Sequence, residues 1–530
     1  MKRLFTILLA VAMLSSFIPA MAATTDTIIY TIERDPQQMD PTLNSYSLSS
    51  QVLQQLFRGL YKLNPEGNGF IPALAASYVQ SEDQKTFTFT MKEGLLWSDG
   101  SPLTAHDIEY SWKRVLDPAV ASKASSDMWV LKNGRAASSG EVGLDEVGVK
   151  ALDDLTLEVT TEALCPWFIS LTATTSFLPV KKEVVEQGSE ENPWTKSPET
   201  YVCNGPYMPV EFSSLEHVKM TKNPNYVDAA NVQVEKLTYA VISDWNTALT
   251  AYNNGDIQVL DNLTADAFAQ YAQSDEYQPV PRIGIQYCDF NCELPEFSDA
   301  RVRRAFAMSL SRAGIMAALR LPYQPVYGFV PYAQPSLTVE GASYRSVAGD
   351  MFVEDAEAAR ALLAEAGYPN GEGFPTVQIV AQSSDEQKLL AQILGEMLKQ
   401  NLGITYEITN LESSTYWDEL DQGNFSIDRN AFTCDYPDAV ANLTIFTTGS
   451  NAYENRWDDP DYDAMIIAAN QIADPAEREA ALIAAEAYLV EQMPAMPIYS
   501  MDSPLLVKPN IKGVIKNVIG HTNFEYATIE

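Results

Sequence analysis

The sequence contains few of the residues on which most enzymatic and metal-binding chemistry depends. Its 530 residues include only three histidines, His106, His217 and His521. No two of them form an H-E-x-x-H zinc motif, and no cysteine accompanies them at metal-ligand spacing. The G-x-S-x-G turn of serine hydrolases and the G-x-x-x-x-G-K-[ST] phosphate loop are also missing. We therefore expect no metal, no cofactor and no enzymatic activity, while a catalytic triad assembled from distant segments stays open as an alternative.

Basic residues are also scarce. The chain has 35 Lys and Arg against 70 Asp and Glu, which gives a formal net charge of −35. A surface this acidic repels the phosphates of nucleic acids and of anionic lipids, so we expect no nucleic-acid partner. The same charge keeps copies of the chain apart and favours a soluble monomer.

Long hydrophobic runs are confined to the N-terminus. Residues 1–22 begin with Lys2 and Arg3, continue with an apolar stretch and end in Ala20-Met21-Ala22, the pattern of a cleaved signal peptide. A membrane anchor is the weaker reading, because the apolar stretch is shorter than the ~20 residues that span a bilayer. No cysteine follows the predicted cleavage site to carry a lipid. We expect a freely diffusing, periplasmic protein.

Cysteines are too few and too scattered to define a framework. Two disulfides and one free thiol can be arranged among Cys165, Cys203, Cys288, Cys292 and Cys434 in fifteen ways, and the sequence does not choose among them. The one close pair is spaced by four residues and does not form the C-x-x-C of zinc sites. Buried thiols or one or two disulfides are expected rather than a metal site.

The hydrophobic pattern predicts an α/β protein. Residues 86–91 and 155–159 alternate between polar and apolar side chains, as half-buried strands do. A strand at 376–380, a helix that carries the apolar residues of 389–398, and a strand at 404–408 predict two parallel strands joined by a right-handed crossover. Further helices are predicted at 299–310, 356–366 and 475–493.

Nine short motifs follow one another along the chain. They are LAASY at 74–78, TFTFTM at 86–91, WSDGSPLTAHD at 97–107, SWKR at 111–114, NGPY at 204–207, KNPNY at 222–226, FSDARVRRA at 297–305, LLAEAGYP at 362–369 and MPAMPIY at 493–499. In sequence and order they resemble the periplasmic oligopeptide-binding proteins, the peptide branch of the solute-binding proteins that serve ABC importers. The resemblance covers essentially the whole chain after the signal peptide.

This resemblance implies a type II-like periplasmic-binding-protein clamshell with two lobes and an additional mixed α/β domain in the first lobe. The first lobe is then discontinuous and consists of residues 23–60, 186–283 and 503–530, with the extra domain at 61–185. The second lobe is formed by residues 284–502. Two crossing strands, near residues 280–290 and 498–506, would form the hinge.

Residues 428–436 resemble the ligand-binding strand of this family, in which an acid pairs with the α-amino group of the peptide. The resemblance places that acid at Asp435; a carboxylate orients an ammonium group strongly in a closed, poorly hydrated cleft. If the segment is extended, every second side chain from Arg429 to Asp435 shares one face, and Arg429 either balances Asp435 or reaches a peptide carboxylate. Main-chain groups of Ala431 and Thr433 would pair with the peptide as an added strand. The alternative is an ordinary strand end with a structural ion pair.

Other candidates come from the same resemblance. Phe432 stands where the family often has Trp, and it is either a pocket wall or part of the core. The loop with Asn44, Ser45 and Tyr46 is expected to meet the ligand from the other lobe. Asp289, which follows the hinge strand, is a candidate for facing the cleft.

Three further positions depart from the family pattern. Gly284 and Thr433 stand where some relatives have a cysteine pair, so that disulfide does not carry over. Ser413 stands where some relatives place a Trp against the ligand, which leaves pocket shape and peptide length open.

The resemblance therefore implies a non-enzymatic receptor that captures short peptides between two lobes and delivers them to an ABC permease in the membrane. Two alternatives remain. The same fold would bind a dipeptide, an opine, a metal chelate or a sugar, or the chain is an exported peptidase.

Overall fold

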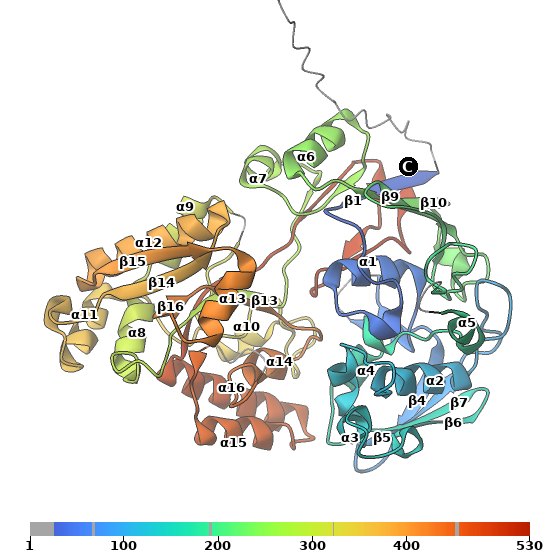
Figure 1. Cartoon of the computed structure of the whole chain (residues 1–530), viewed down its shortest axis with the longest axis horizontal. Coiled ribbons are helices and arrows are strands. Elements are labelled where there is room, and N and C mark those ends of the chain that lie inside the picture. Colours follow the sequence, from blue (N-terminus) through green and yellow to red (C-terminus); the bar gives the residue numbers. More distant parts are fainter. Residues whose placement is uncertain (1–25, 66–68, 190–192, 322, 451–454) are drawn as a thin grey trace, which may run out of the picture.

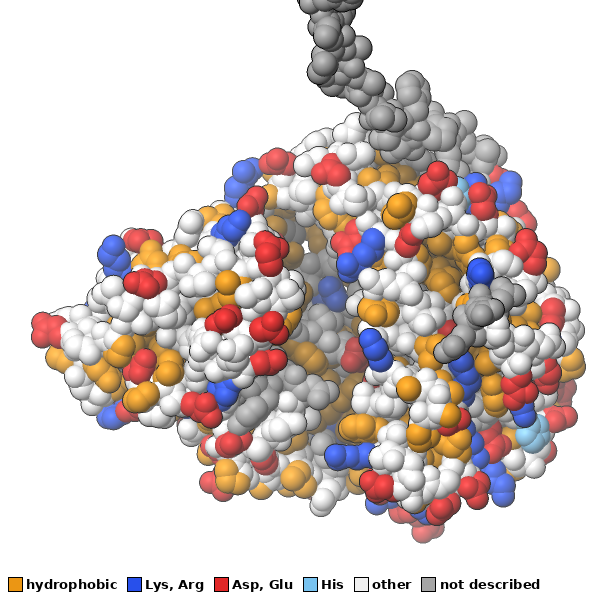
Figure 2. Space-filling model, in the orientation of Figure 1, with side chains coloured by type: hydrophobic (Ala, Val, Ile, Leu, Met, Phe, Trp, Pro, Cys, Tyr) orange, Lys and Arg blue, Asp and Glu red, His pale blue; other side chains and the backbone are white. Residues whose placement is uncertain are grey.

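The computed structural model describes residues 26–65, 69–189, 193–321, 323–450 and 455–530. The predicted signal peptide lies outside them. Two lobes stand side by side and are joined along one side by two extended segments (Figure 1). A groove separates the lobes in the space-filling view (Figure 2). The predicted two-lobed α/β architecture is confirmed.

The first lobe is built on a mixed seven-stranded sheet whose strands come from three distant parts of the chain. Strand β1 (Thr27–Ile32) pairs in parallel with β10 (Lys236–Val241) and with β11 (Val259–Leu260). In spatial order the strands are β12 (Tyr277–Gln278), β19 (Leu505–Val507), β11 (Val259–Leu260), β1 (Thr27–Ile32), β10 (Lys236–Val241), β9 (His217–Lys222) and β8 (Tyr207–Ser213). The helices of this part are α1 (Ser47–Leu56), α6 (Trp245–Asn254) and α7 (Ala265–Tyr271).

A second, four-stranded antiparallel sheet belongs to the same lobe. Its order is β4 (Ala75–Gln80), β5 (Thr86–Met91), β7 (Thr156–Thr160) and β6 (Val149–Asp153), beside the hairpin of β2 (Tyr61–Leu63) and β3 (Phe70–Pro72). Phe87 and Phe89 point inward from β5, as the alternating sequence predicts. The helices here are α2 (Ala105–Leu116), α3 (Gly134–Ser138), α4 (Phe168–Leu171) and α5 (Lys182–Gln187). One continuous hydrophobic core joins this sheet to the main sheet.

The second lobe contains the predicted strand–helix–strand crossover. β14 (Val377–Gln382) runs parallel to β15 (Tyr406–Leu411), and α12 (Asp385–Leu402) connects them. Gly403 ends the helix at a φ of 76°, a conformation that glycine adopts without strain. β16 (Ile427–Asp428) completes this parallel sheet.

An antiparallel sheet lies beside it in the order β17 (Asn430–Thr433), β13 (Gly284–Asp289) and β18 (Ala495–Ser500). Residues 428–436 therefore do not form one strand, because β16 pairs with β14 while β17 pairs with β13. The chain passes from one sheet to the other at Arg429. The other helices of the lobe are α8 (Ala300–Ser309), α9 (Arg312–Leu319), α10 (Tyr344–Ala348), α11 (Ala356–Glu365), α13 (Ser413–Asp421), α14 (Ala439–Thr444), α15 (Pro460–Ala469) and α16 (Pro475–Gln492).

The chain crosses between the lobes twice, once before β13 and once after β18. Main-chain hydrogen bonds tie the two crossings together, from Met501 N–H to Gly284 C=O at 3.0 Å and from Ser503 N–H to Val280 C=O at 2.9 Å. The chain then returns to the first lobe through β19 and four short strands, β20 (Ile511–Lys512), β21 (Ile515–Lys516), β22 (Thr522–Asn523) and β23 (Thr528–Ile529).

Short 3-10 helices occur in the connecting loops. They are η1 (Pro41–Leu43), η2 (Ser125–Val130), η3 (Leu144–Glu146), η4 (Thr175–Phe177), η5 (Ala229–Asn231) and η6 (Pro369–Gly371). All five cysteines carry free thiols. In the part of the chain that the structure describes, no helix is both long and apolar enough to cross a membrane.

Candidate ligand-binding cleft

A cavity of about 760 Å³ lies between the two lobes. Most of its wall comes from the first lobe. The second lobe contributes Thr433, Asp435, Tyr436 and Asn470. The volume is ample for a small organic ligand, and both lobes contact whatever occupies it.

Asp435 lies just beyond the end of β17. Part of its side chain faces the cavity. Within the described residues no cation or hydrogen-bond donor pairs with this carboxylate. Burial by the surrounding protein and the negative charge of Asp127 raise the pKa of Asp435 to about 6. An unpaired carboxylate in such a place is suited to bind a cationic group of a ligand.

Asp127 provides a second carboxylate from the opposite lobe. It lies in η2 and lines the same cavity. The hydroxyl of Ser176 donates a hydrogen bond to it. Burial raises the pKa of Asp127, and this hydrogen bond offsets only part of the effect. Asp127 was not predicted from the sequence, because no motif marks it and only the fold brings it opposite Asp435.

The loop at residues 44–46 lines the cavity from the first lobe. Asn44 is itself buried, and it holds the loop by accepting a hydrogen bond from the Tyr46 N–H at 3.1 Å and donating to Ser50 Oγ at 2.8 Å. Ser45 and Tyr46 are exposed to the cavity side. Asn44 therefore positions the loop, while its two neighbours are available to a ligand.

Five candidates from the sequence do not line the cavity, and two of them are Asp289 and Ser413. Asp289 is fully buried in β13, where its carboxylate accepts hydrogen bonds from the side-chain amides of Asn430 and Asn455 at 3.1 and 3.3 Å. Its expected position facing the cleft is therefore corrected. Ser413 begins α13, a helix that packs on β14 and β15, and it is not among the cavity residues.

The residues before Asp435 form the strand that borders the cleft. β17 is the edge strand of its sheet, and no other described strand pairs with its outer side. Phe432 packs against the core of the second lobe, and its side chain is not among those that line the cavity; neither is that of Ala431. Arg429 also lies outside the cavity lining, and its buried Nε has no hydrogen-bond partner in the described structure.

Two aromatic residues of the cavity lining, one from each lobe, contact each other directly. The rings of Trp167 and Tyr436 stack with centroids 5.5 Å apart and an interplanar angle of 7°. The guanidinium of Arg478 lies 5.0 Å from the centre of the Trp167 ring. Arg478 is held in place by a buried, two-point ion pair with Asp438, with distances of 2.7 and 2.9 Å. Trp167 from the first lobe therefore rests on a rigid surface of the second.

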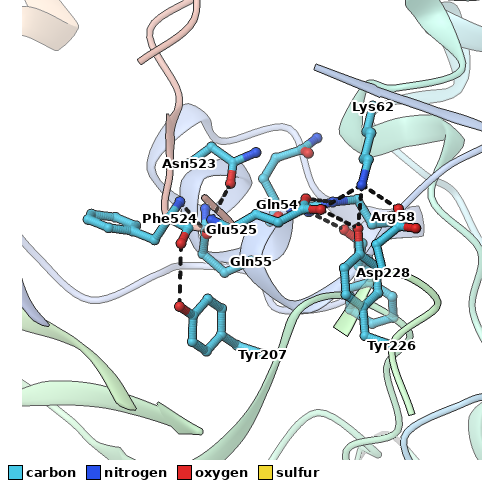
Figure 3. A network of polar contacts seen from close by, with 12 residues as sticks. Gln54, Gln55, Arg58, Lys62, Tyr207, Tyr226, Asp228, Asn523, Phe524 and Glu525 are labelled. Carbon is cyan, nitrogen blue, oxygen red and sulfur yellow. Dashed lines mark hydrogen bonds and ion pairs between the residues drawn. The ribbon is translucent and has the colours of Figure 1, made fainter. Parts of the chain in front are cut away.

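A buried ionic network supports the first-lobe wall (Figure 3). Arg58 and Lys62 line the cavity, and both pair with Glu525, at 2.9 and 2.5 Å. Lys62 also pairs with Asp228, and the hydroxyl of Tyr226 donates to Glu525 at 3.0 Å. Burial alone would raise the pKa of Glu525, but the charges of Arg58 and Lys62 outweigh it and hold the pKa below its usual value. These two basic side chains are thus already neutralised.

Metal binding has no evident location in the described ranges. No group of three or more His, Cys, Asp or Glu residues is placed there to hold an ion. The chemistry that the cleft offers is recognition of charged and main-chain polar groups.

Comparisons with known proteins place the chain among solute-binding proteins. A model for the middle part of the bacterial extracellular solute-binding proteins, family 5, matches residues 69–454. The dipeptide-binding protein DppE of Bacillus subtilis is 29% identical over 501 residues, which cover 93% of this chain and 90% of the relative. The periplasmic murein peptide-binding protein MppA of Escherichia coli is 31% identical over 489 residues, with coverages of 91% and 89%.

Solved structures agree with this placement. The unliganded open form of MppA matches with a TM-score of 0.81 at 29% identity, over 96% of this chain and 98% of that one. Haemophilus influenzae OppA in complex with the peptide RPPGFSPFR matches with a TM-score of 0.76 at 27% identity, over 96% and 99%.

Proposed function

Because the chain belongs to the bacterial extracellular solute-binding proteins of family 5, we propose that it is a monomeric receptor that captures short peptides and delivers them to an ABC importer. It is located in the periplasm, after cleavage of the predicted signal peptide. The observation that carries the proposal is Asp435, an unpaired carboxylate in a cavity between two lobes. The function is binding, without change to any covalent bond of the ligand.

The peptide is held by its charged end and its main chain. The α-ammonium group donates to Asp435, and the main-chain groups of Ala431 and Thr433 on the outer edge of β17 pair with the extended peptide. The Ala431 N–H donates to Asn430 Oδ1 at 2.8 Å and exchanges this partner when the peptide binds. Main-chain pairing gives affinity that depends little on sequence. Arg429 stays a proposed partner of a carboxylate farther along the peptide, and because it lies outside the cavity lining this contact requires its side chain to move.

Ligand capture is coupled to lobe closure. Ser45 and Tyr46 contact the ligand from the first lobe and Asp435 from the second, so the ligand has higher affinity for the closed form and shifts the population toward it. The closed form is the state that the permease recognises.

Native mass spectrometry of protein purified without denaturant tests this proposal. We expect peptide masses to be released on unfolding, and a mixture of synthetic peptides to be returned intact after incubation. The mass of a sugar, opine or metal chelate would favour another solute. Shortened peptides would indicate a peptidase.

Replacing Trp167 by Ala is expected to shift the unliganded protein toward a more open form. The change removes the stack on Tyr436 and the contact with Arg478, and aromatic pairs of this kind contribute ~0.5–1.5 kcal/mol. Small-angle X-ray scattering should therefore give a larger radius of gyration for the variant. Trp129→Ala is the control, because Trp129 also lines the cavity but contacts Arg135 and Ser138 within its own lobe. An equal radius for both variants would show that the stack does not hold the lobes together.

A further inference from the structure

Arg282 lies in the crossing segment between β12 and β13, and its side chain lines the cavity. Its Nη2 donates to the main-chain carbonyl of Ile519 at 2.8 Å and lies 3.4 Å from Thr433 Oγ1. Its Nε is buried and has no hydrogen-bond partner in the described residues. The guanidinium is thus fixed at the cavity wall, and Nη1, which makes no hydrogen bond within the described residues, is the donor left for a ligand.

No carboxylate in the described chain lies within ion-pair distance of Arg282. The two acids whose charges act on Arg282 have other partners, since Asp502 accepts hydrogen bonds from the main-chain N–H of Arg282 and from Ser500 Oγ. Asp261 forms a buried pair with Lys516 at 2.5 Å, and Asp502 is not among the residues that line the cavity. Burial lowers the pKa of Arg282, although these acids counter part of the effect. An unpaired buried cation is costly, which favours a site that is completed by an anion.

The neighbours of Arg282 fix its position without neutralising its charge. Burial and the charges of Arg282 and Lys516 lower the pKa of His521 to about 4, so this ring is neutral at pH 7 and takes no proton in competition. Gly520 has a φ of 107°, and a Cβ there would lie 2.8 Å from Arg282 Nε. The main chain at Gly520 therefore packs directly against the guanidinium and limits its movement.

Resting on the proposed peptide binding, we propose that Arg282 binds a carboxylate carried by the second residue of the peptide. Thr433, which Arg282 approaches, lies two residues before Asp435, about 7 Å along an extended chain. A peptide whose amino group is at Asp435 and whose chain follows β17 has its second residue about 3.4 Å along the strand. A carboxylate carried by the side chain or the C-terminus of that residue covers the remaining distance to Arg282. The carboxylate comes either from an acidic side chain at that residue or from the C-terminus of a dipeptide.

Two pairs of peptides separate these sources by isothermal titration calorimetry. Ala-Glu-Ala is compared with Ala-Gln-Ala, and Ala-Ala with its C-terminal amide. We expect the member that carries the carboxylate to bind at least 10-fold more tightly in one of the pairs, as a charge-assisted bond predicts. In Arg282→Gln that ratio should fall to near one, and in Arg282→Lys it should fall only in part.

Arg320→Gln is the matched control, because it makes the same change of charge at an exposed side chain and should keep the wild-type ratio. Ratios near one in both pairs for the wild type would overturn the role of Arg282 while leaving peptide binding intact. An affinity ratio that is the same in Arg282→Gln as in the wild type would also overturn the role of Arg282. Failure of every peptide to bind would instead overturn the proposed function. The comparison of the two peptides of each pair on the wild-type protein tests the proposal even if a variant does not fold.

Discussion

Asparagine in place of Asp435 is expected to weaken the binding of a tripeptide with a free amino group by about 10- to 100-fold. Hydrogen bonds to a charged group contribute ~1.5–3 kcal/mol, and the amide that replaces the carboxylate carries no charge to attract the ammonium. Calorimetric titration at pH 7.5 measures the change. At that pH Asp435, with a pKa of about 6, is ionised.

Two controls isolate the effect. Acetylating the amino group of the peptide should lower the affinity of the wild type by a similar factor. It should lower the affinity of Asp435→Asn much less, because that variant has already lost the contact between the carboxylate and the ammonium group. Asp418→Asn changes an exposed acid on α13 of the same lobe and should bind as the wild type does. Wild-type affinity in Asp435→Asn would mean that the amino group binds elsewhere.

The same carboxyl predicts how binding depends on pH. The pKa of Asp435 is raised to about 6, so the unliganded protein carries a proton there at pH 5 and has lost it by pH 7.5. Only the ionised form pairs with an ammonium group, so binding below pH 6 must release that proton. Affinity should therefore fall by up to about tenfold per pH unit below 6. The fall should be absent in Asp435→Asn, and a similar fall in both proteins would assign it to another group.

Glutamine in place of Glu525 is expected to destabilise the protein by about 3–5 kcal/mol. Glu525 is fully buried and is the acid that pairs with Arg58, while Lys62 keeps Asp228 as a second partner. Removing one member of a buried ion pair leaves the other charge uncompensated, which costs far more than the pair contributes. Urea unfolding followed by circular dichroism at pH 7.5 measures the loss.

Glu211→Gln provides the comparison on the surface. Glu211 pairs with Lys219 at 2.7 Å, but its side chain is half exposed, and exposed ion pairs contribute little. Its unfolding midpoint should stay at the wild-type value. An unchanged midpoint for Glu525→Gln would show that Arg58 finds water or another acceptor when its partner is removed.

Local signals account for the parts of the fold that the sequence predicts well. Asp299 caps α8, Pro475 stands in the first turn of α16, and Gly403 ends α12, all close to the expected boundaries. Such features depend on residues within a few positions of one another, so they can be recognised in the sequence. The two-lobed architecture came from the order of nine motifs rather than from any single element.

Features set by contacts between distant segments were not predictable in the same way. The strand breaks at Arg429 because the residues before it pair with β14 and the residues after it pair with β13, in two different sheets. The hydrophobic pattern of the sequence does not reveal which strand each segment pairs with. Asp127 and Arg282 reach the cavity from segments about 150 residues apart, and neither stands in a recognisable motif. Asp289 was expected in the cleft because it follows a hinge strand, yet the amides of Asn430 and Asn455 bury it.

The scattered origin of the first-lobe sheet constrains how the protein is made. Strand β19 lies between β12 and β11, and Glu525 closes the network around Arg58. The sheet therefore stays incomplete until the ribosome has delivered nearly the whole polypeptide. The antiparallel sheet of β4 to β7, whose strands are neighbours in the sequence, is free to assemble while synthesis continues. We expect folding to proceed in two stages. The slower stage is completion of the first-lobe sheet, which waits for synthesis of the C-terminal residues.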